Sequence, residues 1–502
     1  MFLKYILLFI VFISYSYASD YKAVNSDSSQ FKLPRLAGDS LPIAGFKRDQ
    51  NLEEVNSIND TFSKGKIKGL LRYSAQHRDT SYYSINDSKP TASNQKRQYS
   101  AIGGYLGYET APWFNTSIGA TFYTAQKAGN NPDERVGLGG LNEDDDKSSS
   151  YTVLGEAFIK FKTDDQRITF GRQEMPNYRF ISLSNIRFSP FTHEGTTYEN
   201  TMIDNLQINL AYITKQKDRN AEHFEDMVRS ARVKSSSARG LSKVEISQNY
   251  NGGGDYSGDN KGMAMLGVTY KIGNANVEVW DYYVDDFVNT IYLYSDYSFS
   301  LSKDTTLTFA GQFAQQNATG DKVAGDVNTW FYGLKTQISH DSGITAFLAY
   351  NEVKYDEGSY DGGTIFVRWG TPQMFNSFQV QDSELGGEKS IGGGVQFELG
   401  KLGLVPNTVI RFRYCDYNLP DNPSQLDIAQ DRTETTFDLR YAFGKNDGFG
   451  IFTQVDGLSI QFRVAYDDFK TNYDVNRYKN PKNISDITDD FWDTRIYVDY
   501  IF

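Results

Sequence analysis

The chain has 502 residues, a net charge of −12 at pH 7 and many aromatic residues, including 35 tyrosines and 34 phenylalanines. The acidic balance argues against a nucleic acid partner, and the single cysteine, Cys415, excludes an intramolecular disulfide. A soluble chain of this length would be expected to form several domains. The high aromatic content, together with 43 glycines and only 12 prolines, instead favours a membrane β-barrel, in which alternate residues meet lipid and aromatic side chains gather at the interfaces.

Residues 1–18 have the pattern of a secretory signal peptide. Lys4 provides a basic start, residues 5–13 form an apolar core, and Ser16 and Ala18 are the small residues that precede a cleavage site. The alternative, a transmembrane helix, is disfavoured because the apolar run is too short to span a bilayer. We therefore expect Sec-dependent export and cleavage near Ala18.

Residues 19–60 are polar, contain Pro34 and Pro42 and show no clear period. We interpret them as a periplasmic N-terminal extension that is too short to form a globular plug. The remaining residues, 61–502, are predicted to form one all-β domain, a transmembrane antiparallel up-and-down β-barrel.

Segments with period-two alternation follow one another from Lys66 to Phe502. Eighteen strands are predicted, and an even number is what a barrel with both termini in the periplasm requires. The segment 196–203 is included partly because this parity demands it. The predicted strands are 66–76, 97–108, 114–126, 151–162, 167–173, 196–203, 206–214, 262–271, 275–284, 289–300, 305–316, 328–339, 343–353, 390–399, 407–417, 433–443, 457–467 and 491–502.

The links between these strands alternate between short and long. The short ones, such as 163–166 and 340–342, are expected to be periplasmic turns, and the long ones extracellular loops. Two links depart from the rule, because 285–288 is short on the outside and 444–456 is long on the inside. The predicted extracellular loops are 77–96, 127–150, 174–195, 215–261, 317–327, 354–389, 418–432 and 468–490.

Several late strands have one apolar face and one face that carries arginine. In 407–417, Ile410 and Phe412 alternate with Arg411 and Arg413. An arginine facing lipid near mid-bilayer costs about 2–4 kcal/mol, so we expect these side chains to point into the lumen. There they would attract anionic groups along a water-filled path. The predicted lumenal arginines are Arg411, Arg413, Arg440, Arg463 and Arg495.

A structural explanation for these arginines is also open. Each could pair with an inward carboxylate, namely Asp438, Asp467 or Asp499, and stiffen the wall. The two roles are compatible with each other.

The final strand also carries a pattern that is typical of a barrel-assembly signal. Its apolar positions end on an aromatic residue, one further residue and Phe502. This resembles the signal that the barrel-assembly machinery reads, although Tyr497 stands where a small residue is common. The apolar face comprises Ile496, Val498, Tyr500 and Phe502.

Three patches of sequence resemble the OprD-type specific porins of the bacterial outer membrane. The first spans residues 167–215 and includes a strand that ends in Gly-Arg-Gln, followed by a loop with an arginine and a proline, a glycine-containing return and a tight turn. The other two are residues 438–441 (DLRY) and 496–500 (IYVDY). The residues of the first patch are Gly171, Arg172, Gln173, Arg187, Pro190, Gly195, Asp204 and Asn205.

The resemblance implies an eighteen-stranded channel in which the loops 174–195 and 354–389 fold inward as a constriction. It places Arg187 at the narrowest point and a basic ladder along one wall, at Arg411, Arg413, Arg440 and Arg463. The acidic wall opposite the ladder has the candidates Asp281, Asp285, Asp286 and Asp382. The family passes small carboxylate-bearing solutes, including amino acids and organic acids, but the particular solute cannot be transferred because the loops match least.

The sequence shows no pattern for catalysis or metal binding. The histidines His77, His193, His223 and His340 fall in predicted loops or turns, without metal-ligand spacing or a nucleophile motif. We therefore expect neither an enzyme nor a cofactor. The alternatives to a diffusion channel are a structural or adhesin-type barrel, an outer-membrane hydrolase barrel and an energy-coupled transporter, which would need a longer plug.

The expected partners follow from this reading. They are small polar or anionic solutes, outer-membrane lipid and lipopolysaccharide, and the barrel-assembly machinery through the last strand. A monomer and a homotrimer are both compatible with the sequence.

Overall fold

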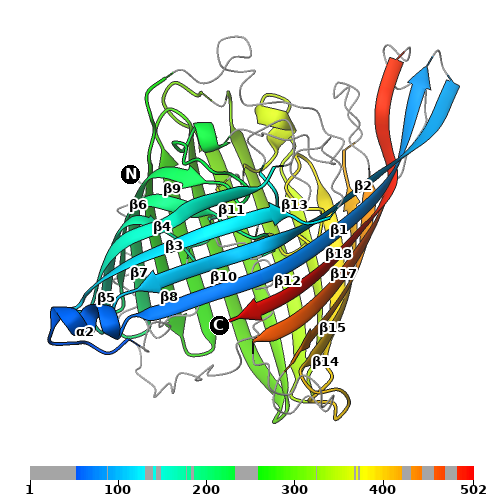
Figure 1. Cartoon of the computed structure of the whole chain (residues 1–502). Helices are drawn as coiled ribbons and strands as arrows, with labels where there is room; N and C mark the ends of the chain where they lie inside the picture. Colours follow the sequence, from blue (N-terminus) through cyan, green and yellow to red (C-terminus); the bar gives the residue numbers. More distant parts are fainter. Residues whose placement is uncertain are drawn as a thin grey trace.

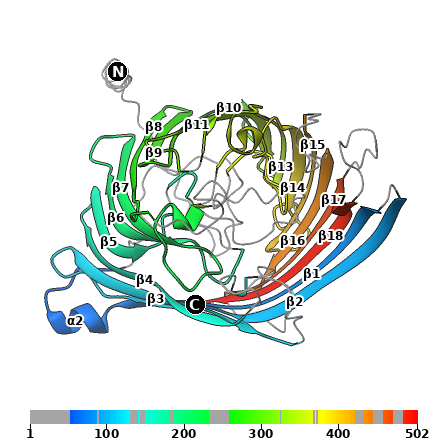
Figure 2. The same ribbon diagram turned by 90° about the horizontal axis from the view of Figure 1, so that it is seen from above.

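The computed structural model describes residues 52–86, 89–129, 140–142, 149–176, 178–181, 186–231, 258–323, 325–366, 369–370, 373–420, 431–443, 457–469 and 483–502. The predicted signal peptide, the extension up to residue 51 and the long inner link 444–456 lie outside this part. Eighteen strands form one antiparallel sheet, in which each strand pairs with the next and β18 pairs with β1 (Figures 1 and 2). The prediction of a closed eighteen-stranded barrel is confirmed.

Most strands begin and end within a few residues of the predicted positions. The strands are β1 (Lys66–Asn86), β2 (Lys89–Glu109), β3 (Thr116–Lys127), β4 (Tyr151–Lys162), β5 (Gln166–Gln173), β6 (Thr192–Asn200), β7 (Leu206–Lys217), β8 (Met263–Ile272), β9 (Ala275–Val284), β10 (Val288–Ser302), β11 (Thr305–Ala318), β12 (Asn328–His340), β13 (Ile344–Val353), β14 (Lys389–Glu398), β15 (Thr408–Asn418), β16 (Arg432–Ala442), β17 (Leu458–Phe469) and β18 (Asn483–Ile501).

Strand takes up most of one predicted extracellular loop, 77–96, and both ends of another, 468–490. β1 and β2 pair up to Asn86 and Lys89, and β18 begins at Asn483, so the segments 77–96 and 468–490 are shorter links than expected. The residues beyond position 76 are polar, but Arg78 and Thr80 continue the inward alternation of β1. The strand pairing therefore continues beyond the apolar, lipid-facing part of the wall. Because the sequence there has no apolar face, alternation did not predict this part of the strand. In Figure 1 the ends of these three strands project beyond the rest of the barrel.

The strand β6 is shifted relative to its prediction, 192–200 instead of 196–203. It pairs with β5 through Gly171 and Gly195, and the chain then turns at residues 201–205, where Asn205 has φ 64°. This shift places His193 inside a strand, and His77 lies in β1, so the prediction that both lie in loops was wrong.

The alternation of side chains along the wall agrees with the predicted faces. On β15, Phe412 and Tyr414 are exposed on the outer surface, whereas Arg411, Arg413 and Cys415 are buried on the inner side. Period two therefore sets the direction of each wall side chain, as expected for a half-buried strand.

One short helix, α2 (Ile58–Ser63), precedes β1. It lies outside the barrel at the end that carries the short turns, and we refer to this as the turn end (Figures 1 and 2). The predicted boundary between extension and barrel, at residues 60 and 61, falls within this helix. Among the described residues, no helix is long and apolar enough to cross a membrane.

Candidate functional site: the barrel lumen

The first inward loop, residues 174–191, is anchored to the barrel wall by a buried ion pair. Arg179 donates from Nε and Nη2 to both oxygens of Glu278 on β9, at 2.9 and 2.8 Å, and both side chains are 0% exposed. Trp280 and Asn276 also donate to Glu278, and the Arg179 guanidinium lies over the ring of Tyr294. Burial opposes the charge of Arg179, but the Glu278 carboxylate outweighs it, so the pKa of Arg179 lies above its ordinary value.

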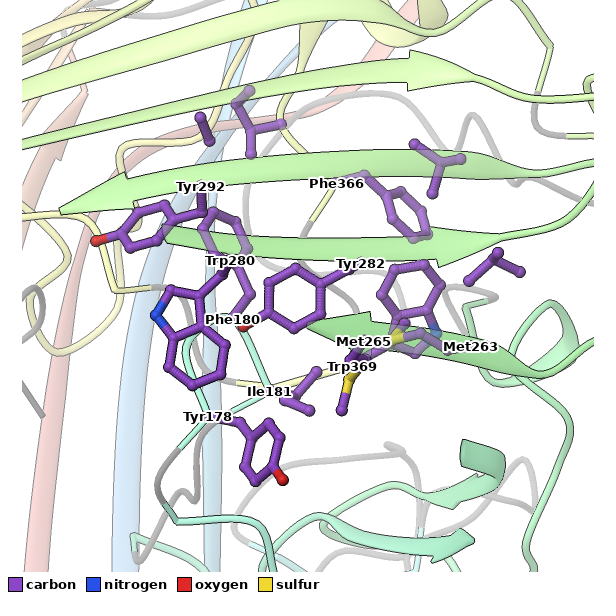
Figure 3. Close-up of a cluster of buried hydrophobic side chains, with 14 of the residues drawn as sticks. Tyr178, Phe180, Ile181, Met263, Met265, Trp280, Tyr282, Tyr292, Phe366 and Trp369 are labelled. Atoms are coloured by element: carbon purple, nitrogen blue, oxygen red, sulfur yellow. The ribbon is translucent and has the colours of Figure 1, made fainter. Parts of the chain in front are cut away.

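Next to this ion pair, one side of the lumen is filled by apolar side chains, which we call the interior cluster (Figure 3). Its wall residues come from β7–β13, and its remaining residues come from segments that enter the barrel. Rings meet edge to face, as Phe180 does with Tyr292 at 4.9 Å. The cluster includes Tyr178, Phe180, Ile181, Met227, Val228, Met263, Met265, Trp280, Tyr282, Tyr292, Phe331, Phe366, Trp369, Met374 and Phe375.

The second inward loop, residues 354–388, reaches across the lumen from the interior cluster to the opposite wall. The main-chain N–H groups of residues 379, 380 and 381 all donate to the Glu434 carboxylate on β16, at 2.9–3.0 Å. Gln381 also bonds Asp467 and Arg432, and Arg432 pairs with Glu388 at 2.8 Å. A carboxylate that accepts successive main-chain donors holds a loop firmly, so this end of the loop is fixed to β16 and β17.

The two inward loops touch each other closely. A Cβ built on Gly370 would lie 2.4 Å from the Phe180 carbonyl oxygen and 2.5 Å from the Ile181 Cα, so only glycine fits at this contact. His193 on β6 approaches the Trp369 carbonyl, with 3.3 Å between the atoms. The segment after β7 also takes part, because Trp369 donates to the Met227 carbonyl at 2.9 Å.

The polar side of the lumen lies along β14–β18 and β1, opposite the interior cluster. Arg413 and Arg463 share one carboxylate, Asp438, at 3.3 and 2.5 Å, and Arg411 donates to the side-chain oxygen of Gln396 at 2.9 Å. The ring of Phe378 from the second inward loop covers Arg413. The predicted ladder therefore faces inward, but ion pairs and loop side chains cover much of it.

The remaining two predicted wall arginines, Arg495 and Arg440, differ in how deeply they are buried. Arg495 is buried and pairs with Asp493, which also holds Arg78 at 2.6 Å. Arg440 is only half-buried on the inward face of β16. Of the three carboxylates expected as wall partners, Asp438 pairs with two of the predicted arginines, whereas Asp499 pairs with Arg72 and Asp467 accepts a hydrogen bond from Gln381.

Arg187 lies in the first inward loop and is held from β1. Arg72 forms two hydrogen bonds to Asp499 on β18, at 2.7 and 2.6 Å, and its Nη1 donates to the main-chain carbonyl of Arg187 at 2.7 Å. The Arg187 guanidinium forms no ion pair with a carboxylate of the described residues. Burial, followed by the positive charges of Arg219 and Arg495, lowers the pKa of Arg187.

The predicted acidic wall opposite the ladder is not present as expected. Asp281 shares the outward face of β9 with Val277 and Tyr283 and accepts a hydrogen bond from Asn289, so it does not face the lumen. The alternation on β9 instead directs Glu278 inward. The expectation for Asp281 was wrong because Trp280 and Tyr282, large aromatic residues, occupy the inner face.

The other acidic candidates are also placed elsewhere. Asp285 and Asp286 form the tight outer turn between β9 and β10 and pair with Lys261, at 3.6 and 2.6 Å. Asp382 is half-buried in the second inward loop, next to Gln381, on the segment that docks against the arginine wall. None of these three lies on a wall that faces the ladder.

Sequence reasoning missed several residues of this site. Arg72 falls in a predicted strand with the parity of the inward side chains Ser74 and Gln76, so alternation could have identified it. Arg179 and Arg219 lie in loops, for which periodicity offers no signal. The described residues contain no group of three or more histidine, cysteine, aspartate or glutamate side chains that could hold a metal ion.

A closed barrel of this size, with inward loops and a polar wall, has the architecture of an outer-membrane porin. A comparison with protein-family models matches residues 82–479 to the family described as outer membrane porin, OprD family. The chain belongs to the OprD family of outer membrane porins. The resemblance seen in the sequence is thereby confirmed.

Solved structures agree with this assignment. The chain is similar to OpdK of Pseudomonas aeruginosa (TM-score 0.64, 16% identity, covering 88% of this chain and 99% of that one). It is also similar to OpdQ of the same organism (0.61, 17%, 88% and 99%) and to OccAB1 of Acinetobacter baumannii (0.63, 16%, 90% and 99%). Among curated proteins no match is found. Membership of the family places the chain in the bacterial outer membrane, among porins, which are channels and not enzymes.

Proposed function

We propose that this porin is a passive diffusion channel with a preference for small solutes that carry a carboxylate, such as amino acids or organic acids. The observation that carries the proposal is Arg187. Its guanidinium belongs to an inward loop, and the charges of Arg219 and Arg495 act on it while no described carboxylate pairs with it. An anion that passes this point would relieve the repulsion among the three cations, and a cation would increase it.

The arginine wall also favours anionic solutes, but its effect is smaller than that of Arg187. Arg411, Arg413 and Arg463 face inward together with one carboxylate, Asp438, so this group retains a positive balance. Paired and covered guanidiniums act on a solute through their field more than through contact. Arg187 is the proposed contact residue, together with Arg440, which is more exposed than Arg411, Arg413 and Arg463, and the other arginines provide the background potential.

The proposed solute class has support from one relative and from nearby aromatic groups. The structure of OpdK was determined with vanillate, an aromatic carboxylate. In this chain the rings of Tyr99 and Tyr497 lie on the polar side, close enough to influence Arg187, and the Arg72 guanidinium lies over the Tyr497 ring at 5.1 Å. This arrangement would suit a solute that combines a carboxylate with a flat apolar part.

Reversal potentials in planar bilayers test the proposal. Arg187→Gln should shift the reversal potential in a salt gradient towards cation preference and slow the uptake of carboxylate solutes, with the larger effect at low salt. Lys303→Gln is the matched control, since Lys303 is an exposed cation in the turn between β10 and β11. Equal selectivity in the Arg187→Gln protein and the parent channel would contradict the proposal.

We also infer that the chain reaches the membrane after export and loses residues 1–18. N-terminal sequencing of protein from outer membranes should begin close to Ser19. Retention of Met1 there would exclude cleavage near Ala18.

A further inference from the structure

We propose that helix α2 and the turn between β2 and β3 form a membrane-contacting shelf outside the barrel. We define this rim shelf by four side chains, Ile58, Phe62, Trp113 and Phe114. Its partner is the boundary between headgroups and acyl chains in the lipid leaflet at the turn end, which the topology of outer-membrane barrels places towards the periplasm. The proposal is independent of which solute the channel passes.

The helix is held firmly against the barrel. Val55 donates its main-chain N–H to the Pro112 carbonyl and Ala111 donates to the Thr61 carbonyl, both at 2.9 Å. The hydroxyl of Tyr108 on β2 donates to the Phe62 carbonyl. These bonds fix both ends of the helix to the β2–β3 turn, so its outer surface keeps one orientation relative to the wall.

The start of the helix is defined by its own sequence. Ser57 is the N-cap, and its side chain accepts a hydrogen bond from the main-chain N–H of Asp60 at 3.1 Å. The side chain of Thr61 is buried towards the barrel, whereas the stripe with Ile58 and Phe62 and the stripe with Asn59 and Ser63 are both exposed. A helix of six residues would not persist alone in water. The stability of α2 therefore depends on its contacts with the barrel and with its surroundings.

The outer surface of the shelf is strongly apolar and exposed. Ile58 and Phe62, four residues apart, lie on one stripe of the helix and are 58% and 59% exposed. Phe114 is 71% exposed, and its ring lies 5.0 Å from that of Trp113. Phe114 also has φ 50°, an unfavourable conformation for a bulky residue, and the turn accepts it while the ring points outward.

The shelf is continuous with the lipid-facing surface of the barrel. Ile67 on β1, Ile118 on β3 and Phe161 on β4 lie at the turn end of their strands and are exposed on the outer face. Figure 1 places α2 at this end of the barrel, and Figure 2 shows that it lies outside the wall, beside β3 and β4. Because these wall residues meet lipid in any outer-membrane porin, the adjoining shelf meets the same leaflet at its polar boundary.

The residue types fit this boundary. Tryptophan and other aromatic residues are enriched where the headgroups begin, and a helix with one apolar stripe lies in that plane. The neighbouring stripe of α2 carries Asn59 and Ser63, which are exposed and polar. The helix therefore has a lipid side and a water side, as an interfacial element requires.

Site-specific fluorescence in vesicles tests the shelf. Single cysteines replace Phe62, Asn59 or Ser63 in a Cys415→Ser background, carry a small polarity-sensitive fluorophore and are reconstituted into vesicles of phosphatidylethanolamine and phosphatidylglycerol. Nitroxide-bearing phospholipids, labelled near the headgroup end of the acyl chain, report lipid contact, and iodide reports water contact. Phe62→Cys should be quenched by the nitroxide several-fold more strongly than Asn59→Cys or Ser63→Cys, and iodide should show the reverse order.

Two outcomes would overturn the proposal. Equal access of iodide to positions 62 and 63 would show that the shelf faces water. Protection of position 62 from iodide without quenching by the lipid nitroxide would show that protein covers it, either residues that precede the helix or a second copy of the chain. Phe114→Cys provides a second labelled position on the shelf and should follow Phe62→Cys if that variant folds poorly.

Discussion

The guanidinium of Arg72 connects the seam of the barrel to the main chain of Arg187. Arg72 faces Asp499 directly across the β1–β18 pairing, binds both of its carboxylate oxygens, and donates a third hydrogen bond to the Arg187 carbonyl at 2.7 Å. The position of the inward loop thus depends on a residue of the first strand. The planar, five-donor guanidinium can serve two acceptors in this way, and an ammonium group cannot do so with the same geometry.

Replacement of Arg72 by lysine should therefore release the loop while a charge pair with Asp499 remains. A hydrogen bond from a charged donor contributes about 1.5–3 kcal/mol, so residues 186–190 should move more freely. We expect higher single-channel conductance and weaker anion preference in planar bilayers. Arg78→Lys is the control, because Arg78 lies on the same strand and binds Asp493 without bonding to the first inward loop. Unchanged conductance in Arg72→Lys would show that other contacts hold Arg187.

Glu278→Gln should strongly destabilise the anchor of the first inward loop. It leaves the Arg179 guanidinium buried without its counter-ion, and such a loss typically costs about 3–5 kcal/mol. The half-exposed pair of Arg172 and Glu194 offers a comparison, since Glu194→Gln should cost about 0–1 kcal/mol. Urea unfolding monitored by tryptophan fluorescence measures both. Similar midpoints for the two variants would argue against a structural role for the buried pair.

Gly370→Ala should separate the two inward loops without changing any charge. The added methyl group would overlap with the main chain at Phe180 and Ile181, which cannot move aside as a flexible side chain could. We expect altered conductance with nearly unchanged ion selectivity. Gly358→Ala in the same loop is the control, because the nearest atom to its new Cβ, an Asp356 oxygen, lies at 3.4 Å. Identical conductance in both variants would mean that the contact has no influence on the path.

The docking of the second inward loop should depend on pH through Glu388. Burial raises the pKa of Glu388 from 4.5 to about 7, although Arg432 acts in the opposite direction. The folded state then binds a proton more tightly than the unfolded state does. This contribution to stability is fully present below pH 4.5 and is lost as the pH rises through about 7.

The size of this pH effect follows from the shift. A difference of roughly 2.5 pKa units corresponds to about 3 kcal/mol as an upper value. Hydrogen exchange, corrected for intrinsic rates, should give a larger opening free energy for residues 373–388 at pH 5 than at pH 8. Glu388→Gln should flatten this profile. A profile that is unchanged by the substitution would assign the pH dependence to another group.

Local periodicity was sufficient to predict the barrel. Alternation places Phe412 and Arg411 on opposite faces whatever the rest of the chain does, since successive side chains of a strand point in opposite directions. The inward direction of Arg411, Arg413 and Arg463 follows from this rule together with the cost of a charge in lipid, whereas the number of strands also required the even-number rule for barrels. The same rule failed beyond residue 76, where β1 continues without an apolar face to mark it.

The tertiary structure alone decided which groups meet inside the barrel. Arg72 and Asp499 are 427 positions apart in the chain, and Arg179 and Glu278 are 99 apart. Their contacts depend on strand register, on closure of the sheet and on the paths of two long loops. The inward direction of Trp280 and Tyr282 was not predicted from the sequence, because these aromatic residues pack against the entering loops and not against lipid. Side-chain direction along a strand is a local property, whereas the partner of a buried charge depends on distant segments of the chain that folding brings together.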